Sequence, residues 1–251
     1  MNRNYLKYIL IGGASIFVWT GCDDYLNRES TSGVNTPDLI WQNPKAITAV
    51  LADMYDSGLK LDEFDDWYGS KKANLANQTS LSDEATASYQ KESAFDKSNS
   101  TYSYGDYVFN DDMVTRYKQI RIVNNFLLNI EKTSVLSEDE KEELGAEARF
   151  IRAMQYFGLV KRYGGVPLIT VPQALTDDLY VKRASTKDCF DFIISELKAC
   201  AESLPDSYSG DNLGRATKGA AKGLLGRVLL FRASPQFNPN KNSEHWQTAY
   251  D

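Results

Sequence analysis

The sequence has 251 residues, of which 42% are hydrophobic and 25% are charged, a composition typical of a folded globular chain. Acidic residues outnumber basic residues by 34 to 28, and the formal net charge is −6. Charge does not attract such a chain to a phosphate backbone, so we expect no nucleic-acid partner. Beyond residue 21, no segment is apolar over the length of about 20 residues that a membrane-spanning helix needs.

Residues 1–21 have the organisation of a signal peptide. Two basic residues are followed by an uncharged, mostly apolar run at residues 8–19, which is too short to span a bilayer. The run ends in Trp19-Thr20-Gly21-Cys22, and small residues before a cysteine resemble the lipobox of bacterial lipoproteins. We therefore predict cleavage before Cys22 and acylation of its thiol. The alternative is an ordinary secretory signal with a coincidental cysteine.

Residues 22–37 are expected to form a polar tether. Two aspartates follow Cys22 directly, and acidic residues in this place resemble the surface-export signal of Bacteroidota lipoproteins. More than one acyl chain on the cysteine gives stable membrane anchoring. We therefore expect a protein held at the surface of the outer membrane by its lipid alone.

After the tether, apolar residues recur at the three- and four-residue spacing of helices that bury one face. Asn43 is placed as an N-cap before Pro44, and Ser137 can form a capping box with Glu140. The expected helices cover residues 44–58, about 112–130, 137–163, 186–204 and 217–231, and residues 243–250 read as the opening of another.

Three glycines interrupt the helix predicted at residues 217–231. Gly219, Gly223 and Gly226 share one helical face, and each costs about 1 kcal/mol relative to alanine. We predict that they pack closely against a neighbouring helix backbone. Helices of these lengths with small contact residues are similar to tetratricopeptide repeats. The fold class is therefore predicted to be mainly α, a tetratricopeptide-like helix-pair scaffold with long irregular loops.

The two cysteines beyond Cys22 are expected to be buried and unpaired. Cys189 and Cys200 lie on one predicted helix, where their separation is roughly 16 Å. A disulfide needs Cα atoms within about 7 Å.

A long aromatic segment separates the first two predicted helices. Residues 60–111 are rich in Ser, Asn, Asp and Tyr, and a loop of this length is often functional. Aromatic side chains bury the apolar faces of sugar rings, and amides and carboxylates orient the hydroxyls. The alternative is that these aromatics pack the loop onto the helices. The candidate ligand-binding residues are Trp67, Tyr68, Tyr102 and Tyr104, with Asn74, Asn77 and Asp83.

Two segments resemble the signatures of the SusD/RagB family. The first is Ala146-Glu147-Ala148-Arg149-Phe150-Ile151-Arg152-Ala153, followed by Tyr163-Gly164-Gly165-Val166-Pro167-Leu168-Ile169. The second is Arg215-Ala216-Thr217-Lys218-Gly219-Ala220-Ala221-Lys222. The resemblance implies a surface lipoprotein that binds glycan, or in some cases peptide, and delivers it to a SusC-type TonB-dependent transporter. It also implies that residues 38–251 are the N-terminal helical domain of a longer protein, truncated at its C-terminus.

The sequence offers little for catalysis. Its one histidine, His245, lies in a polar stretch, and there is no HExxH motif, Cys/His cluster or P-loop. We expect no catalytic residue, metal or cofactor. Two alternatives to the transport function stay open. One is a helical-repeat scaffold that binds only protein, and the other is a surface glycoside hydrolase using two of the 34 acidic residues.

Overall fold

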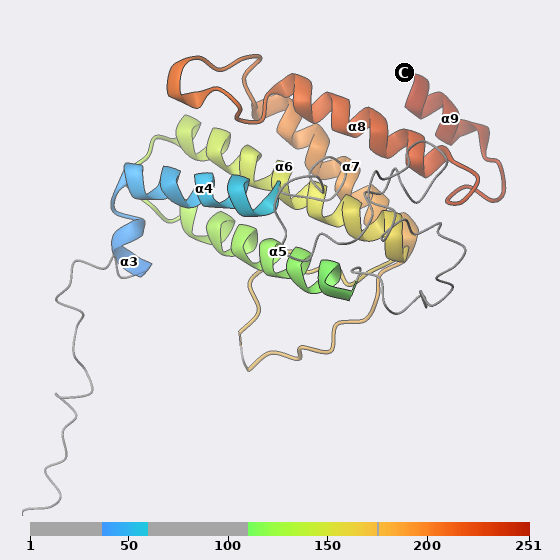
Figure 1. The fold of residues 1–251 in the computed structure, drawn as a ribbon, viewed down its shortest axis with the longest axis horizontal. Helices are drawn as coiled ribbons and strands as arrows, with labels where there is room; N and C mark the ends of the chain where they lie inside the picture. The colour runs from blue at the N-terminus through green and yellow to red at the C-terminus, as the bar shows by residue number, and fades with distance from the viewer. Residues whose placement is uncertain (1–36, 60–109, 175) are drawn as a thin grey trace, which may run out of the picture. The chain divides into compact units, whose positions relative to one another are not determined.

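The computed structural model describes residues 37–59, 110–174 and 176–251. Within these ranges the chain forms helices and loops, without a β-strand (Figure 1). None of the described helices is long and apolar enough to cross a membrane. In chain order the elements are α3 (Pro37–Ile40), α4 (Pro44–Gly58), α5 (Asn110–Ile130), α6 (Glu138–Tyr163), α7 (Thr186–Ser203), the 3-10 helix η2 (Gly210–Asn212), α8 (Lys218–Ala233) and α9 (Ser243–Tyr250).

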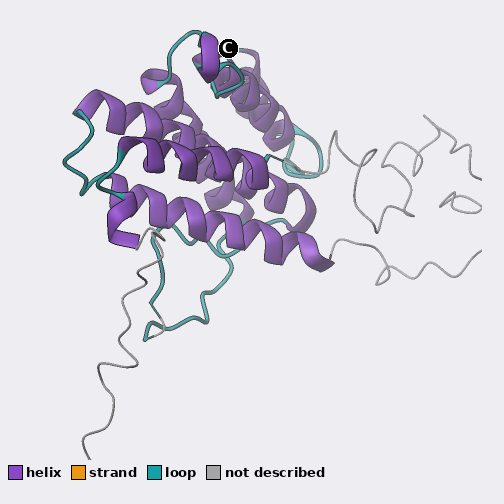
Figure 2. Cartoon of the chain, turned by 60° about the vertical axis from the view of Figure 1, so that its left-hand side comes forward, coloured by secondary structure: helices purple, strands orange, loops and turns teal. Residues whose placement is uncertain are grey.

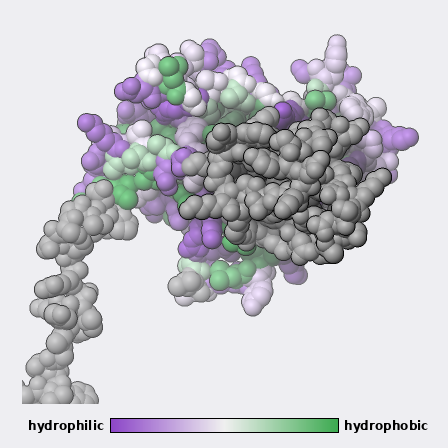
Figure 3. Space-filling model, viewed as in Figure 1, coloured by the Kyte–Doolittle hydropathy of each residue, from purple (hydrophilic) through white to green (hydrophobic). Residues whose placement is uncertain are grey.

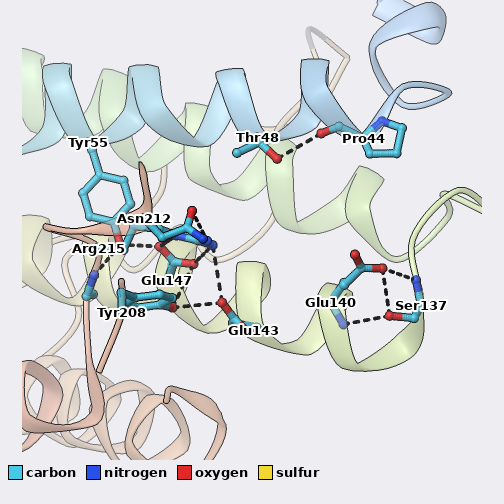
Figure 4. A network of polar contacts seen from close by, with 11 residues as sticks. Pro44, Thr48, Tyr55, Ser137, Glu140, Glu143, Glu147, Tyr208, Asn212 and Arg215 are labelled. Carbon is cyan, nitrogen blue, oxygen red and sulfur yellow. Dashed lines mark hydrogen bonds and ion pairs between the residues drawn. The ribbon is translucent and has the colours of Figure 1, made fainter. Parts of the chain in front are cut away.

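The predicted helix starts are confirmed by their caps. The Asn43 side chain accepts a hydrogen bond from the backbone N–H of Lys45 at 3.0 Å, which begins α4. At α6, the backbone N–H of Ser137 donates to Glu140 at 2.8 Å, and the Glu140 N–H donates back to Ser137 Oγ at 3.3 Å (Figure 4). The second helix begins slightly earlier than predicted, at Asn110.

Helices that follow one another along the chain pack side by side. From residue 110 onward, α5 packs on α6, α6 on α7, α7 on α8 and α8 on α9, while α4 contacts both α5 and α6 (Figures 1 and 2). Because α6 is covered from several sides, nearly every residue from Leu144 to Val160 is buried. This arrangement is the predicted helix-pair scaffold, with α6 as its central helix.

Buried apolar residues form two clusters that share α5 and α6. The larger cluster joins α5 to α8 through residues such as Phe157, Phe190 and Leu197. The smaller cluster joins α4 to α5 and α6 through residues such as Leu51 and Phe126. The scaffold is therefore continuous from α4 to α8.

Cys189 and Cys200 are both buried and unbridged, as expected. Cys200 Sγ donates to the carbonyl oxygen of Ala146 at 3.2 Å, which links α7 to α6. Burial raises the pKa of Cys200 to about 12, so this thiol stays protonated at neutral pH. Both residues act as small core side chains.

The prediction for the glycines of α8 is wrong. Gly219 and Gly223 are exposed, and a Cβ added at Gly223 or Gly226 would meet no described atom within 4 Å. The buried residues of α8 are Ala221, Val228, Leu229 and Ala233. Residues two positions apart on a helix point in roughly opposite directions, so Gly219 and Gly223 face away from the buried Ala221, while Gly226, three positions before Leu229, stands half-buried at the edge of the packed face. The helix was predicted correctly, but its packed face was not.

Close approach does require glycine at another place, directly after α6. Gly164 has a φ of 69°, which favours glycine. A Cβ at Gly165 would overlap the carbonyl oxygen of Ala184, because the backbone N–H of Ala184 donates to the Val166 carbonyl at 3.0 Å and holds the two segments together. The glycine pair therefore allows the chain after α6 to lie against the segment that leads into α7.

The two kinds of glycine respond differently to substitution. Gly165→Ala should lower the free energy of unfolding by about 1–3 kcal/mol, because the backbone of Ala184 must move. The matched variant Gly223→Ala should raise it by up to about 1 kcal/mol, because the methyl group meets open space and improves helix propensity. Urea unfolding followed by circular dichroism measures both values. Equal stability of the two variants would contradict this account of the glycines.

Candidate functional site

The residues predicted from the sequence to bind ligand lie outside the described residues. This holds for the aromatic and polar candidates of the long loop and for the lipidation site. They remain predictions: Trp67, Tyr68, Asn74, Asn77, Asp83, Tyr102, Tyr104 and Cys22. The described part of the chain shows instead the buried ion pairs that join the helices and a groove on the surface of the scaffold.

A fully buried carboxylate is surrounded by polar side chains from other parts of the chain (Figure 4). Glu147, on α6, is 0% exposed. Arg215 donates from Nε to Glu147 Oε2 at 2.9 Å and from an Nη to Oε1. The hydroxyl of Tyr55 on α4 donates to Oε2 at 2.6 Å, and the hydroxyl of Tyr208 lies 3.4 Å from Oε1. Arg215 and Tyr55 therefore supply three donors to a charge that burial would otherwise make very costly, while the single Tyr208 proton has a shorter hydrogen bond, at 3.0 Å, to Glu143.

The partners of Glu147 extend this network into the backbone. The Tyr55 hydroxyl accepts a hydrogen bond from the N–H of Ala216 at 2.8 Å. Burial raises the pKa of Tyr55, and the charge of Glu147 raises it further, so this hydroxyl keeps its proton. The guanidinium of Arg215 lies over the Tyr208 ring, 4.8 Å from its centroid. One carboxylate thus ties α4, α6 and the loop before α8 together.

A second buried ion pair joins α6 to α7. Arg152 Nη2 lies 2.6 Å from Glu196 Oε2, and both side chains are almost fully buried. The Arg152 Nη1 group donates to Asn124 Oδ1 at 2.8 Å and to the Thr170 carbonyl at 3.2 Å. Arg149 lies 3.6 Å from the same glutamate. The charged residues of the first signature are therefore the residues that form the internal ion pairs.

The extended segment after α6 is fixed by side chains beneath it. The Tyr156 hydroxyl accepts from the N–H of Ile169 at 2.7 Å and donates to its carbonyl at 2.9 Å. Asn124 donates to the same carbonyl at 2.8 Å, and the Tyr117 hydroxyl donates to the Pro167 carbonyl at 2.7 Å. Burial raises the pKa of Tyr156 to about 12. This segment therefore runs along α5, held in place by these hydrogen bonds, and we call it the wall.

A groove of about 500 Å³ lies between this wall and α5, and we call it the α5 groove. Its lining is mostly apolar, with cationic and amide groups among the apolar side chains. The exposed fractions of Val114 and Val171 are 53% and 65%. Exposed hydrophobic residues are also visible at the lower margin of Figure 3. The lining residues are Met113, Val114, Tyr117, Lys118, Ile120, Arg121, Asn124, Ile169, Val171, Pro172 and Gln173.

The α5 groove was not predicted from the sequence. A usable signal was present, because Val114 stands four positions before Lys118 and seven before Arg121, which places a valine on a cationic face. The wall of the groove comes from a segment about 50 residues further on, as the 50-residue separation of Tyr117 and Pro167 shows. Local patterns do not reveal such a partner.

A smaller cavity of about 300 Å³ lies beside His245, between α7, α8 and α9. It is lined by Lys187, Leu229, Arg232, Asn242, Glu244, His245 and Thr248. Its described lining includes one carboxylate, that of Glu244, and no cysteine. In the parts of the chain that the structure describes, no three His, Cys, Asp or Glu side chains lie together as metal ligands would.

Comparison with known proteins places these features in a family. A family model of SusD-like proteins, described as starch-binding and associating with the outer membrane, matches residues 24–230. A SusD-like protein of Bacteroides ovatus is 34% identical over 119 residues, which cover 47% of this chain and 21% of the relative. SusD-like protein P2 of Formosa agariphila is 22% identical over 242 residues, which cover 92% of this chain and 44% of the relative. The chain thus spans less than half the length of these relatives.

Solved structures of SusD-like proteins share the fold. One from Bacteroides fragilis is 30% identical, with a TM-score of 0.58, and the match covers 84% of this chain and 39% of that chain. A laminarin-binding SusD-like protein is 26% identical, with a TM-score of 0.61 and coverage of 78% and 42%. A SusD homologue from Bacteroides thetaiotaomicron is 25% identical, with a TM-score of 0.65 and coverage of 86% and 41%.

The ion pair at Glu147 yields a stability prediction. Arg215→Met should lower the free energy of unfolding by about 3–5 kcal/mol, because it leaves the buried Glu147 charge without its cation. Adding Glu147→Gln to this variant should restore part of the loss. Lys218→Met is the matched control, since Lys218 pairs with the exposed Asp206 at 3.7 Å, and it should change stability by less than about 1 kcal/mol. Denaturant unfolding distinguishes the two, and a harmless Arg215→Met would contradict the prediction.

Proposed function

The chain belongs to the SusD-like family of outer-membrane-associated, carbohydrate-binding proteins, and from this we propose that it is a cell-surface lipoprotein that binds glycan and delivers it to a SusC-type TonB-dependent transporter. The observation that carries the proposal is the family match over residues 24–230. The Glu147–Arg215 pair supports it from the structure, because it joins the two segments that resemble the family's signatures.

Glycan is the ligand that the similar proteins favour. A structure 26% identical to this chain is that of a laminarin-binding SusD-like protein. The segment of residues 60–111 contains aromatic residues of the kind that can stack on sugar rings, and Trp67 and Tyr68 are the first candidates within it. Peptide is the second ligand class, since aromatic surfaces also bind apolar side chains.

We further propose that the protein acts by binding, without catalysing a reaction. The family that matches is described by starch binding. The described residues near His245 offer no pair of carboxylates with which to cleave a glycosidic bond. Release of reducing sugar from a polysaccharide by the purified protein would instead support a surface glycoside hydrolase.

Binding tests the ligand class. The protein without its lipid, and its Trp67→Ala and Tyr68→Ala variants, should be titrated calorimetrically with laminarin oligosaccharides and other neutral glycans and with peptides. We expect each substitution to weaken glycan binding about tenfold, the loss of roughly 1.4 kcal/mol of ring contact. Tyr250→Ala is the matched control, because Tyr250 is an exposed aromatic in α9 and its loss should change nothing.

Two results would overturn parts of this proposal. Full affinity in both loop variants would remove these two residues from the site. If no glycan or peptide bound while the protein captured the transporter, the chain would be a protein-binding scaffold, the alternative left open by the sequence.

The lipid anchor has its own test. Replacing Cys22 with alanine should release the protein from the membrane fraction, because no other part of it is expected to enter the bilayer. Fractionation of cells and protease treatment of intact cells measure anchoring and surface exposure, and Cys200→Ala is the matched cysteine control. If the Cys22→Ala protein stayed in the outer membrane, an anchor other than this lipid would be required.

A further inference from the structure

We propose that the α5 groove is a subsite for the negatively charged group of an acidic saccharide, either a uronate carboxylate or a sulfate ester. This proposal rests on the glycan-binding function proposed above and narrows its substrate class. It is carried by the charges of the groove lining, by the apolar surface beside them and by the rigidity of the wall.

The charged side chains of the groove are cationic, whereas the net charge of the protein is negative. The chain as a whole carries 34 acidic and 28 basic residues, yet among the residues that the structure describes, the charged ones that line the groove are Lys118 and Arg121. They stand one helical turn apart on α5, so their side chains project on the same side. Both are exposed, and neither forms an ion pair with any residue of the described ranges. Two cations are thus available to one anionic group.

The chemistry of the two cations suits carboxylate and sulfate. A guanidinium binds two oxygens of one anion through parallel hydrogen bonds, and an ammonium adds a compact charge with three donors. The amide of Gln173, on the opposite wall, can meet sugar hydroxyls. Two cations on an acidic protein are too few to hold a nucleic-acid backbone, so a small saccharide anion is the better match.

The apolar part of the groove provides surface for the sugar ring itself. Val114 and Val171 stand exposed on opposite sides, with Tyr117 between Val114 and Lys118 in the sequence. The hydroxyl of Tyr117 is engaged by the Pro167 carbonyl at 2.7 Å, so its ring is held in position. Sugar rings present apolar C–H faces that pack on such surfaces.

The wall of the groove is formed in advance of any ligand. Asn124 and Tyr156 hold the carbonyl of Ile169, and Arg152 holds the carbonyl of Thr170. These holding residues are themselves buried. A wall that is already ordered loses little conformational freedom on binding, which favours affinity for a small ligand.

The test compares three oligosaccharides of similar length: a neutral laminarin oligosaccharide, an oligogalacturonate and a sulfated galactan oligosaccharide. Calorimetric titrations use the unmodified protein, the double variant Lys118→Gln/Arg121→Gln and the control Lys222→Gln, which removes an exposed cation from α8. We expect the unmodified protein to prefer at least one acidic oligosaccharide. The double variant should lose that preference by about 10- to 100-fold, and the control should keep it. Added salt should weaken acidic binding more than neutral binding.

The outcomes separate this proposal from the general function. Preference for the oligogalacturonate would identify a uronate subsite, and preference for the sulfated galactan a sulfate subsite. Equal binding of neutral and acidic oligosaccharides, or an unchanged acid preference in the double variant, would overturn the subsite and leave glycan binding intact. Failure of all glycans to bind would overturn both. Circular dichroism of the double variant should match that of the unmodified protein, because both side chains are exposed.

Discussion

The buried carboxylate of Glu147 is the constraint on which the helical scaffold depends. A charge with 0% exposure is stable only when donors replace the water that it has lost, and here the Arg215 guanidinium and the Tyr55 hydroxyl do so. These donors come from α4 and from the loop between α7 and α8. They reach the Glu147 carboxylate only when the helices are assembled. The interaction therefore specifies how these parts meet more than it adds to net stability.

The same reasoning explains the other polar residues of α6. Arg152 is held by Glu196 of α7, by Asn124 of α5 and by the carbonyl of Thr170. The Arg152–Glu196 ion pair is thus connected by a hydrogen bond to the wall of the α5 groove. The same buried residues that stabilise the scaffold therefore also fix the shape of this groove. A rigid helical stack that presents preformed walls and irregular loops suits a protein whose proposed task is to bind and hand on a ligand.

What could be predicted from the sequence was local. Asn43 and the Ser137–Glu140 pair marked helix starts because a cap depends on residues only a few positions apart. The Glu147–Arg215 pair spans 68 positions, and nothing local in either segment indicates the other. Resemblance to a family identified both segments without showing that they touch. The prediction for the glycines of α8 was wrong because their spacing shows that they share a face but does not show which face of the helix is buried.

Native-state hydrogen exchange at Ala216 tests the role of Glu147 most directly. The N–H of Ala216 donates to the Tyr55 hydroxyl, which in turn donates to Glu147, although Ala216 lies outside any helix. If the carboxylate unites α4, α6 and this loop, the Ala216 amide should exchange only through global unfolding, with the same opening free energy as amides in the centre of α6. Exchange through local opening, at a free energy well below that of α6, would contradict the account.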